Sequence, residues 1–173
     1  MRNSLVAVVY LLAVTAAIAQ PTKVVEDRNV GVRLKVPQNW TSSGRGNDLF
    51  IDCAPDKNDQ GRPECYFTIR RVVAPDGQKA ITEADRATWD SWATAKGMRK
   101  VLSTKDITVA GFPAHEIVVK TGAYRLRRVM ILVPGKGEVF DSSFIAMGKN
   151  DKDEYDAYNP AFAAALATLV PIE

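Results

Sequence analysis

The segment from Ile107 to Pro171 most constrains the fold, because it alternates β-type runs with strong turn signals and then changes to a helical pattern. Its first short run, Ile107 to Val109, is followed by Ala110-Gly111 and then by a longer run from Phe112 to Lys120. Glycine adopts the left-handed backbone of a two-residue turn without strain, so this arrangement predicts a β-hairpin.

Two more strands are predicted after this hairpin. The run from Tyr124 to Val133 contains Val129 to Val133, which is apolar at consecutive positions and therefore indicates a central strand covered on both faces. Pro134 to Gly137 is a strong turn signal, and Glu138 to Ala146 returns as the next strand.

A helix is predicted to close the segment. Asn159 is a suitable N-cap, and Pro160 suits the first helical position. Pro171 is expected to end the helix. Apolar residues at spacings of three and four form one helical face that must pack on the sheet; they are Tyr155, Tyr158, Phe162, Leu166 and Leu169.

The N-terminus has the pattern of a secretory signal peptide. A basic Arg2 precedes an apolar run and the small-residue site Ala17-Ile18-Ala19, so we expect residues 1–19 to be removed. The apolar run is short for a membrane span, which disfavours the alternative of a stable membrane anchor. Residues 20–173 then form a single α+β domain, and the mature protein is periplasmic or secreted.

The segment before the cysteines predicts two strands and a loop. Val24-Val25 and the alternating run from Val30 to Val36 indicate strands, and the glycine-containing stretch from Thr41 to Asn47 indicates a flexible loop. The chain carries 23 basic and 20 acidic residues, which is too balanced to favour nucleic-acid binding.

Cys53 and Cys65 are the two cysteines, and export favours a disulfide between them. If they face each other across an antiparallel hairpin, Ile51 faces Phe67 and Leu49 faces Ile69, so that six residues suited to a core share one face. The bridge closes a loop of about a dozen residues, worth about 3 kcal/mol in the chain-entropy model.

A second helix is predicted from Thr82 to Lys96, beginning with a capping-box pattern in which Asp85 replaces the usual Glu or Gln. Trp89 and Trp92 share one face of it. Packing on the sheet is the preferred interpretation, and a ligand-binding cleft beside these two rings is the alternative.

No constellation of residues in the sequence indicates catalysis. His115 is the single histidine, and its alternate neighbours in a strand are aliphatic, so we expect a hydrogen-bonded structural residue. A hydrolase would require this histidine to be partly exposed, near a carboxylate and a nucleophile. The sequence predicts no metal site and no cofactor. Five arginines form a basic surface if their strands are neighbours: Arg70, Arg71, Arg125, Arg127 and Arg128.

The order of elements resembles the PsbP-like fold, which includes the extrinsic photosystem II protein, Mog-type Ran-binding proteins and DcrB-type envelope proteins. The resemblance rests on Gly31 to Trp40, on Val109 to Ala114, and on Phe140 to Ala146 running into the helix of Tyr158 to Leu169. It implies an antiparallel sheet with packed helices and a binding or accessory role. It supplies no catalytic residues, and the disulfide hairpin has no counterpart in the pattern.

We therefore expect a non-enzymatic factor that binds or stabilises another envelope component, an envelope protein being the suspected partner. A small-ligand carrier is the alternative.

Overall fold

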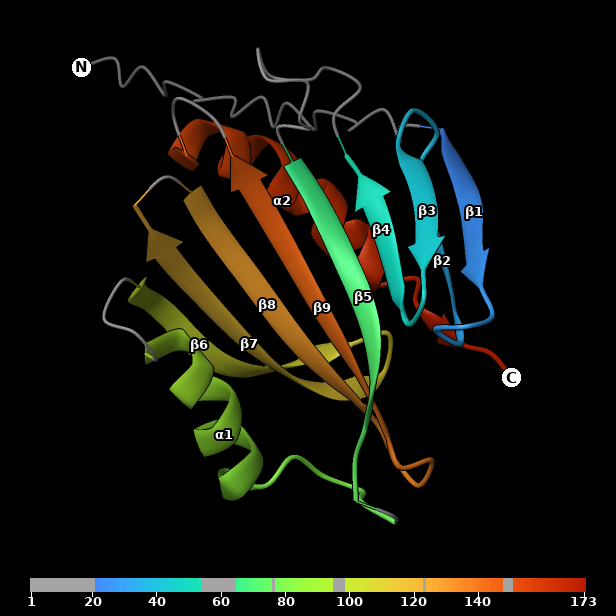
Figure 1. Ribbon diagram of the computed structural model, residues 1–173, viewed down its shortest axis with the longest axis vertical. Coiled ribbons are helices and arrows are strands. Elements are labelled where there is room, and N and C mark those ends of the chain that lie inside the picture. The colour runs from blue at the N-terminus through green and yellow to red at the C-terminus, as the bar shows by residue number, and fades with distance from the viewer. Residues whose placement is uncertain (1–20, 54–64, 76, 95–98, 123, 148–150) are drawn as a thin grey trace, which may run out of the picture.

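Antiparallel strands make up most of the residues that the structure describes. The computed structural model describes residues 21–53, 65–75, 77–94, 99–122, 124–147 and 151–173 (Figure 1). The predicted signal peptide lies outside these residues. The strands and helices, in chain order, are β1 (Thr22–Asp27), β2 (Val32–Pro37), β3 (Thr41–Arg45), β4 (Asp48–Asp52), β5 (Cys65–Val73), α1 (Glu83–Thr94), β6 (Arg99–Val109), β7 (Phe112–Thr121), β8 (Tyr124–Val133), β9 (Glu138–Met147), α2 (Asp151–Leu166) and β10 (Val170–Pro171).

Seven strands form one antiparallel sheet in the order β3-β4-β5-β9-β8-β7-β6. A second sheet of three strands has the order β1-β2-β10. The predicted α+β class, with helices packed on an antiparallel sheet, is confirmed. The separate small sheet was not predicted, and its third strand, β10, follows α2 at the C-terminal end of the described chain.

The two helices cover opposite faces of the large sheet. Helix α2 packs against β9, β8 and β5, and also against β2 of the small sheet, whereas α1 packs over β6 and β7 (Figure 1). None of the helices in the described residues is long and apolar enough to span a membrane.

The main core lies between the large sheet, α2 and the small sheet. Its centre is a cluster of rings in which Phe162 of α2 lies 5.4 Å from Phe67 and 5.0 Å from Phe144, measured between ring centroids. Trp40 extends the cluster, with its ring 5.8 Å from Phe67. The alternating residues of β2 complete it from the other side, because Val32, Leu34 and Val36 are all buried.

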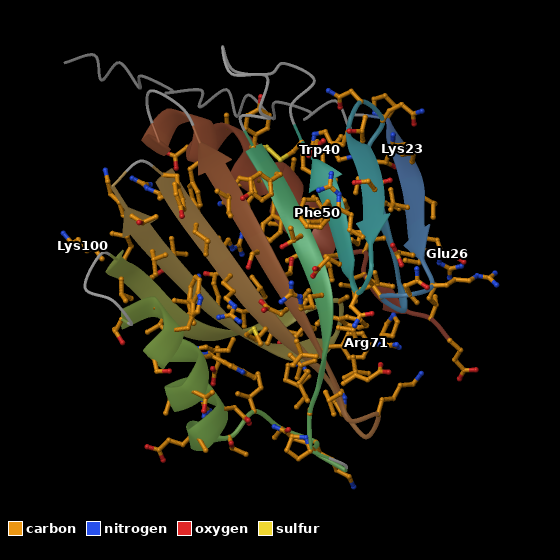
Figure 2. The ribbon with its side chains drawn as sticks, in the orientation of Figure 1. Lys23, Glu26, Trp40, Phe50, Arg71 and Lys100 are labelled. Carbon is orange, nitrogen blue, oxygen red and sulfur yellow. A yellow bond between two sulfur atoms is a disulfide. The ribbon has the colours of Figure 1, made fainter. Side chains whose placement is uncertain are left out.

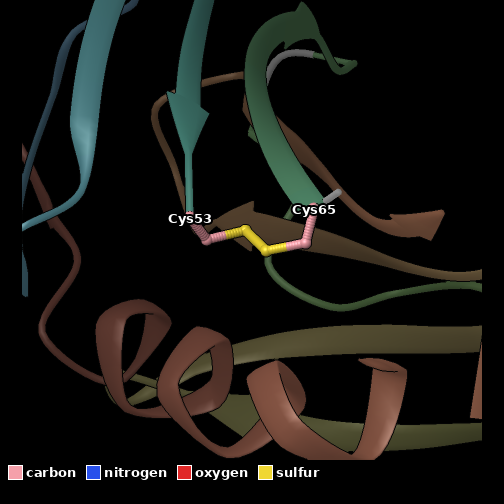
Figure 3. The surroundings of a disulfide bond; sticks show 2 residues. All are labelled: Cys53 and Cys65. Carbon is pink, nitrogen blue, oxygen red and sulfur yellow. A yellow bond between two sulfur atoms is a disulfide. The ribbon is translucent and has the colours of Figure 1, made fainter. Parts of the chain in front are cut away.

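The hairpin of β4 and β5 has the register that the cysteine spacing predicts. Ile51 pairs with Phe67 and Leu49 pairs with Ile69. All four side chains are buried. The bridge between Cys53 and Cys65 joins the ends of the two strands, with their Cα atoms 5.5 Å apart (Figure 3). The predicted disulfide-bridged hairpin is confirmed.

Loss of this disulfide is expected to lower the free energy of unfolding by about 3 kcal/mol, because the bridge restricts the unfolded chain across a separation of 12 residues. Urea denaturation of the oxidised protein and of the Cys53→Ala/Cys65→Ala variant measures the difference. The mass of the unreduced protein provides the control, since the bridged form is two hydrogens lighter than the dithiol. Two free thiols in that spectrum would contradict the assignment.

The start of the closing helix was predicted too late. Helix α2 begins at Asp151, so that Asn159 and Pro160 lie inside it and do not cap it. Tertiary packing explains the difference, because Tyr155 is buried against Phe144 and this contact extends the helix well before Asn159. The helix also ends at Leu166, and Pro171 belongs to β10.

The two edge strands of the large sheet were underestimated. The predicted flexible loop of residues 41–47 contains β3, which pairs with β4 along its whole length. The predicted short strand of residues 107–109 is the end of the 11-residue strand β6, which pairs with β7 and is interrupted by a bulge between Val101 and Ser103. Both strands are largely exposed, and so neither shows the apolar alternation that identifies an inner strand.

Helix α1 has the predicted capping box. The Thr82 hydroxyl accepts a hydrogen bond from the Asp85 backbone N–H at 3.2 Å, and the Asp85 carboxylate accepts one from the Thr82 N–H at 2.7 Å. The described helix ends at Thr94, and the expected C-terminal residues of this helix lie outside the described residues. Ala93 is buried, and Trp89 and Trp92 are half-buried, so the helix contacts the sheet through this side.

Candidate binding surface on the open half of the sheet

The face of the large sheet that carries α1 is covered over only part of its width. Helix α1 lies over β6 and β7, while no described helix packs on the same face of β3, β4, β5 and β9 (Figures 1 and 2). We call the side chains that these four strands present there the open face. They include Ser43, Arg45, Asp48, Phe50, Asp52, Tyr66, Thr68, Arg70, Asp141, Ser143 and Ile145.

A shallow hollow of about 300 Å³ lies in the open face. Phe50, Tyr66 and Ile145 give it apolar walls together with Leu126 of β8, and Thr68 and Ser143 place two hydroxyls in it. Thr68 and Ser143 are paired residues on the adjacent strands β5 and β9, so the two hydroxyl groups lie next to each other. Apolar walls with a few polar groups are typical of a binding hollow.

Two ion pairs border this hollow. Arg70 donates two hydrogen bonds to Asp48, at 2.5 and 2.8 Å, and Arg128 donates two to Asp141, both at 2.8 Å. The Arg128 guanidinium also lies over the Trp92 ring of α1, 4.6 Å from its centroid. These bidentate contacts hold planar charged groups in fixed positions around the hollow.

Acid is expected to remove the stabilisation that Asp48 provides. The hydrogen bonds from Arg70 lower the pKa of Asp48 below 3.8, so the unfolded chain binds a proton there before the folded protein does. The contribution is therefore complete above the unfolded pKa and is lost as the pH falls through the lower folded value. In urea denaturation, Asp48→Asn should have a lower free energy of unfolding than the unsubstituted protein at pH 7, and this difference should shrink toward pH 2. An equal difference at both pH values would contradict this assignment.

The five arginines of the predicted basic surface lie on two faces of the sheet. Strand β9 separates β5 from β8, so the condition of neighbouring strands is not met. Arg70 and Arg128 lie on the open-face side, whereas Arg125 and Arg127 point to α2, where they lie 5.4 Å from the Tyr155 ring and 5.3 Å from the Phe162 ring. Arg71 lies 3.6 Å from Glu138, and its guanidinium approaches Gly31 of the small sheet.

Trp89 and Trp92 contact neighbouring side chains on the sheet. The Trp89 ring packs beside Met130 and Leu132 and lies 6.0 Å from the His115 ring, while Trp92 packs with Ile117, Val119 and Leu126. The hollow lies beside the Trp92–Arg128 pair and is lined by strand residues.

His115 is buried beneath α1 and bonded through both ring nitrogens. Its Nδ1 lies 2.7 Å from Asp106, and its Nε2 lies 3.0 Å from both Asp90 and the Thr104 hydroxyl. Arg86 of α1 donates to Asp106 at 3.0 Å. These contacts join α1 to β6 and β7. The hydrogen bond from His115 is the main reason that the pKa of Asp106 is lowered.

This arrangement fits a structural histidine. The hydrolase alternative needs a partly exposed histidine, but His115 is 3% exposed. Nδ1 is engaged by the Asp106 carboxylate, and Nε2 by the Asp90 carboxylate and the Thr104 hydroxyl, so neither ring nitrogen is open to a substrate. Within the part of the chain that the structure describes, no cluster of acidic, histidine or cysteine residues is arranged to hold a metal ion.

The sequence analysis singled out the arginines, the tryptophans and His115, but it did not identify the residues that surround His115 or the hollow in the open face. Thr104 and Asp106 reach His115 because residues 99–106 extend β6, a part of the strand that was not predicted, and Asp90 reaches it from α1. Phe50 is apolar and alternates with Asp48 and Asp52 on one face of β4, and this pattern is a sequence signal of the hollow.

The fold is similar to several solved structures. Cyanobacterial PsbP (CyanoP) from Synechocystis sp. PCC 6803 has a TM-score of 0.56 and 11% identity, over 91% of this chain and 95% of that chain. The Ran-binding protein Mog1p from Saccharomyces cerevisiae has a TM-score of 0.59 and 8% identity, over 90% and 97%. LpqN of Mycobacterium tuberculosis, described as involved in cell envelope biogenesis, has a TM-score of 0.56 and 16% identity, over 88% and 91%. No protein-family model matches the sequence. No curated protein matches it either.

Proposed function

We propose that this chain, which has the PsbP/Mog1-like fold, is an exported, non-enzymatic protein that binds another protein of the cell envelope as an accessory or stabilising factor. The open face is the proposed binding surface. The observation that carries the proposal is a sheet face that has no covering helix and presents Phe50, Tyr66 and Arg70. Arg128 of β8 and Trp92 of α1 border this face.

The composition of this surface supports a protein partner. Aromatic residues and arginine are enriched at protein interfaces, where they supply most of the binding energy. The bidentate pairs hold Arg70 and Arg128 in place before binding, so little side-chain entropy remains to be lost. The paired charges also leave the surface close to neutral, and such a surface suits a partner with few net charges.

Two observations support the proposed location outside the cytoplasm. The Cys53–Cys65 disulfide is typical of periplasmic and secreted proteins. The N-terminal sequence has the pattern of a cleaved signal peptide. LpqN, which has a similar fold, is described as involved in cell envelope biogenesis, and a location in the envelope would agree with this.

Photo-crosslinking in the producing cells tests the proposal. A photoreactive amino acid replaces Thr68 at the centre of the open face, or Lys35 on the exposed side of the small sheet as the control. An envelope protein joined through position 68 and absent at position 35 is the expected result, and excess unlabelled protein should compete with it. The same adducts at both positions, or none at position 68, would overturn the proposal.

A small-ligand carrier is the second candidate, and the hollow of about 300 Å³ favours it. That volume is at the lower end of ligand pockets. Native mass spectrometry of the purified protein tests this function. A bound small molecule that is lost on Phe50→Ala or Ser143→Trp substitution would support a carrier, and a spectrum of the unliganded chain alone would count against it.

A further inference from the structure

A row of alternating charges crosses the open face at right angles to its strands. In the strand register, Arg45 of β3 is opposite Asp48 of β4. Asp48 is opposite Arg70 of β5, and Arg70 is opposite Asp141 of β9. The sequence of charges across the four strands is therefore positive, negative, positive, negative. Opposite charges on adjacent strands stabilise a sheet, but that role does not require the row to contain an even number of charges.

Such a row is complementary to itself. A two-fold axis that runs parallel to the strands, between β4 and β5, reverses the order of the row in a second copy of the chain. Arg45 then faces Asp141 of the second copy, and Asp48 faces Arg70 of the second copy. Two sheets related in this way pack face to face with their strands aligned, which is a common arrangement, and each contact occurs twice, as in isologous dimers.

The neighbouring rows are complementary under the same axis. Asp52 of β4 is opposite Tyr66 of β5 in the strand register. The axis therefore brings the Asp52 carboxylate opposite Tyr66 of the second copy, whose phenol can donate a hydrogen bond to it. Phe50 is paired with Thr68 and therefore faces Thr68 of the second copy, with the hollow beside it.

Helix α1 does not obstruct this arrangement. The four strands that overlap are β3, β4, β5 and β9, whereas α1 packs over β6 and β7 and reaches β8 through the rings of Trp89 and Trp92. In the pair of molecules, β8, β7 and β6 of each copy extend past the β3 edge of the other, so that α1 lies outside the overlap.

We propose that the occupant of the open face, in the absence of another partner, is a second copy of this chain, docked face to face through the Arg45–Asp48–Arg70–Asp141 row. The self-associated form hides the surface assigned above to an envelope partner. Only this competition rests on the proposed function; the homodimer itself does not.

Sedimentation velocity of the purified, oxidised protein from micromolar to submillimolar concentration tests the homodimer. We expect a reversible monomer–dimer equilibrium whose dissociation constant rises as salt is added, because salt screens the charge pairs. Arg45→Glu places a carboxylate opposite Asp141 of the second copy and should raise the dissociation constant about tenfold or more. Arg45 is exposed, so the fold should survive this change. Arg33→Glu makes the same charge change at an exposed position on the small sheet and should leave the equilibrium unaltered.

A cross-linking experiment tests the predicted register. Ser43 and Ser143 are the outer members of the Phe50–Thr68 row, and the axis places Ser43 opposite Ser143 of the second copy. Within one molecule the two residues are three strand spacings apart, about 14 Å. A mixture of the Ser43→Cys and Ser143→Cys proteins, treated with a short bismaleimide, should give more covalent dimer than either protein alone.

The outcomes separate this inference from the proposed function. A monomer at every concentration would overturn the homodimer, and cross-links that do not depend on mixing would overturn its predicted register. Neither result would affect the adduct expected at position 68. Conversely, failure to capture an envelope protein would leave the sedimentation result in place. A position-68 adduct whose mass is twice that of the chain would itself support the homodimer.

Discussion

Replacing Glu116 with alanine is expected to lower the free energy of unfolding by about 3–5 kcal/mol, because it leaves a largely buried arginine without its counter-charge. The Glu116 side chain is 5% exposed and that of its partner Arg127 is 14% exposed. Arg127 donates to Glu116 through Nε at 2.6 Å and also through its second terminal nitrogen, and Lys105 approaches Glu116 at 3.3 Å. Arg127 further donates to Asn159 of α2 at 2.8 Å, so that the pair also anchors the helix.

Urea denaturation at neutral pH, with the disulfide intact, measures this effect. Glu26→Ala is the matched control, since Glu26 pairs with Arg28 at an exposed site and its removal should change stability by about 0.5 kcal/mol or less. The double variant Glu116→Met/Arg127→Met should be more stable than Glu116→Ala, because it removes both charges and fills the space. A double variant as unstable as the single one would show that the unpaired charge is not the cause.

Phe162→Ala is the second substitution with a large expected effect, a loss of about 3–5 kcal/mol. Phe162 is fully buried, and its ring contacts Phe67 of β5 and Phe144 of β9, which lie 5.4 and 5.0 Å away between centroids. The same ring receives the Arg127 guanidinium at 5.3 Å, so truncation opens a cavity at the centre of the contact between α2 and the sheet.

Thermal and urea denaturation of Phe162→Ala and Phe162→Leu measure this contribution. Leucine keeps most of the apolar volume and should cost about 1.5 kcal/mol or less beyond the lost ring contacts. Equal losses for the two variants would show that stability depends on the aromatic contacts and not on the filled volume. A loss below about 1 kcal/mol for alanine would contradict the central position of this ring in the core.

Local signals in the sequence predicted the inner hairpins well. The φ angles of 50° at Ala110 and 86° at Gly111 fit the predicted two-residue turn, and Val109 pairs with Phe112 across it. Val129 to Val133 is buried on both faces, as expected of an inner strand, because α2 and the small sheet cover one face and α1 covers part of the other.

The candidate site was much less accessible to sequence reasoning. The order of the strands in the sheet decides whether the arginines form one surface. Strand β9 lies between β5 and β8, and its pairing with β5 joins distant parts of the chain. The environment of His115 likewise depends on Asp90 from α1 and Asp106 from β6, which packing brings together.

The sequence by itself determined the disulfide hairpin and its register, the capping box of α1 and the α+β class. Each of these follows from short-range spacing, since pleat alternation and turn chemistry act over a few residues. Tertiary structure alone decided the length of the polar edge strands, the start of α2 and the existence of the open face. These features depend on which distant surfaces bury one another, and a polar segment such as β3 gains its order from pairing with β4 and not from its own composition.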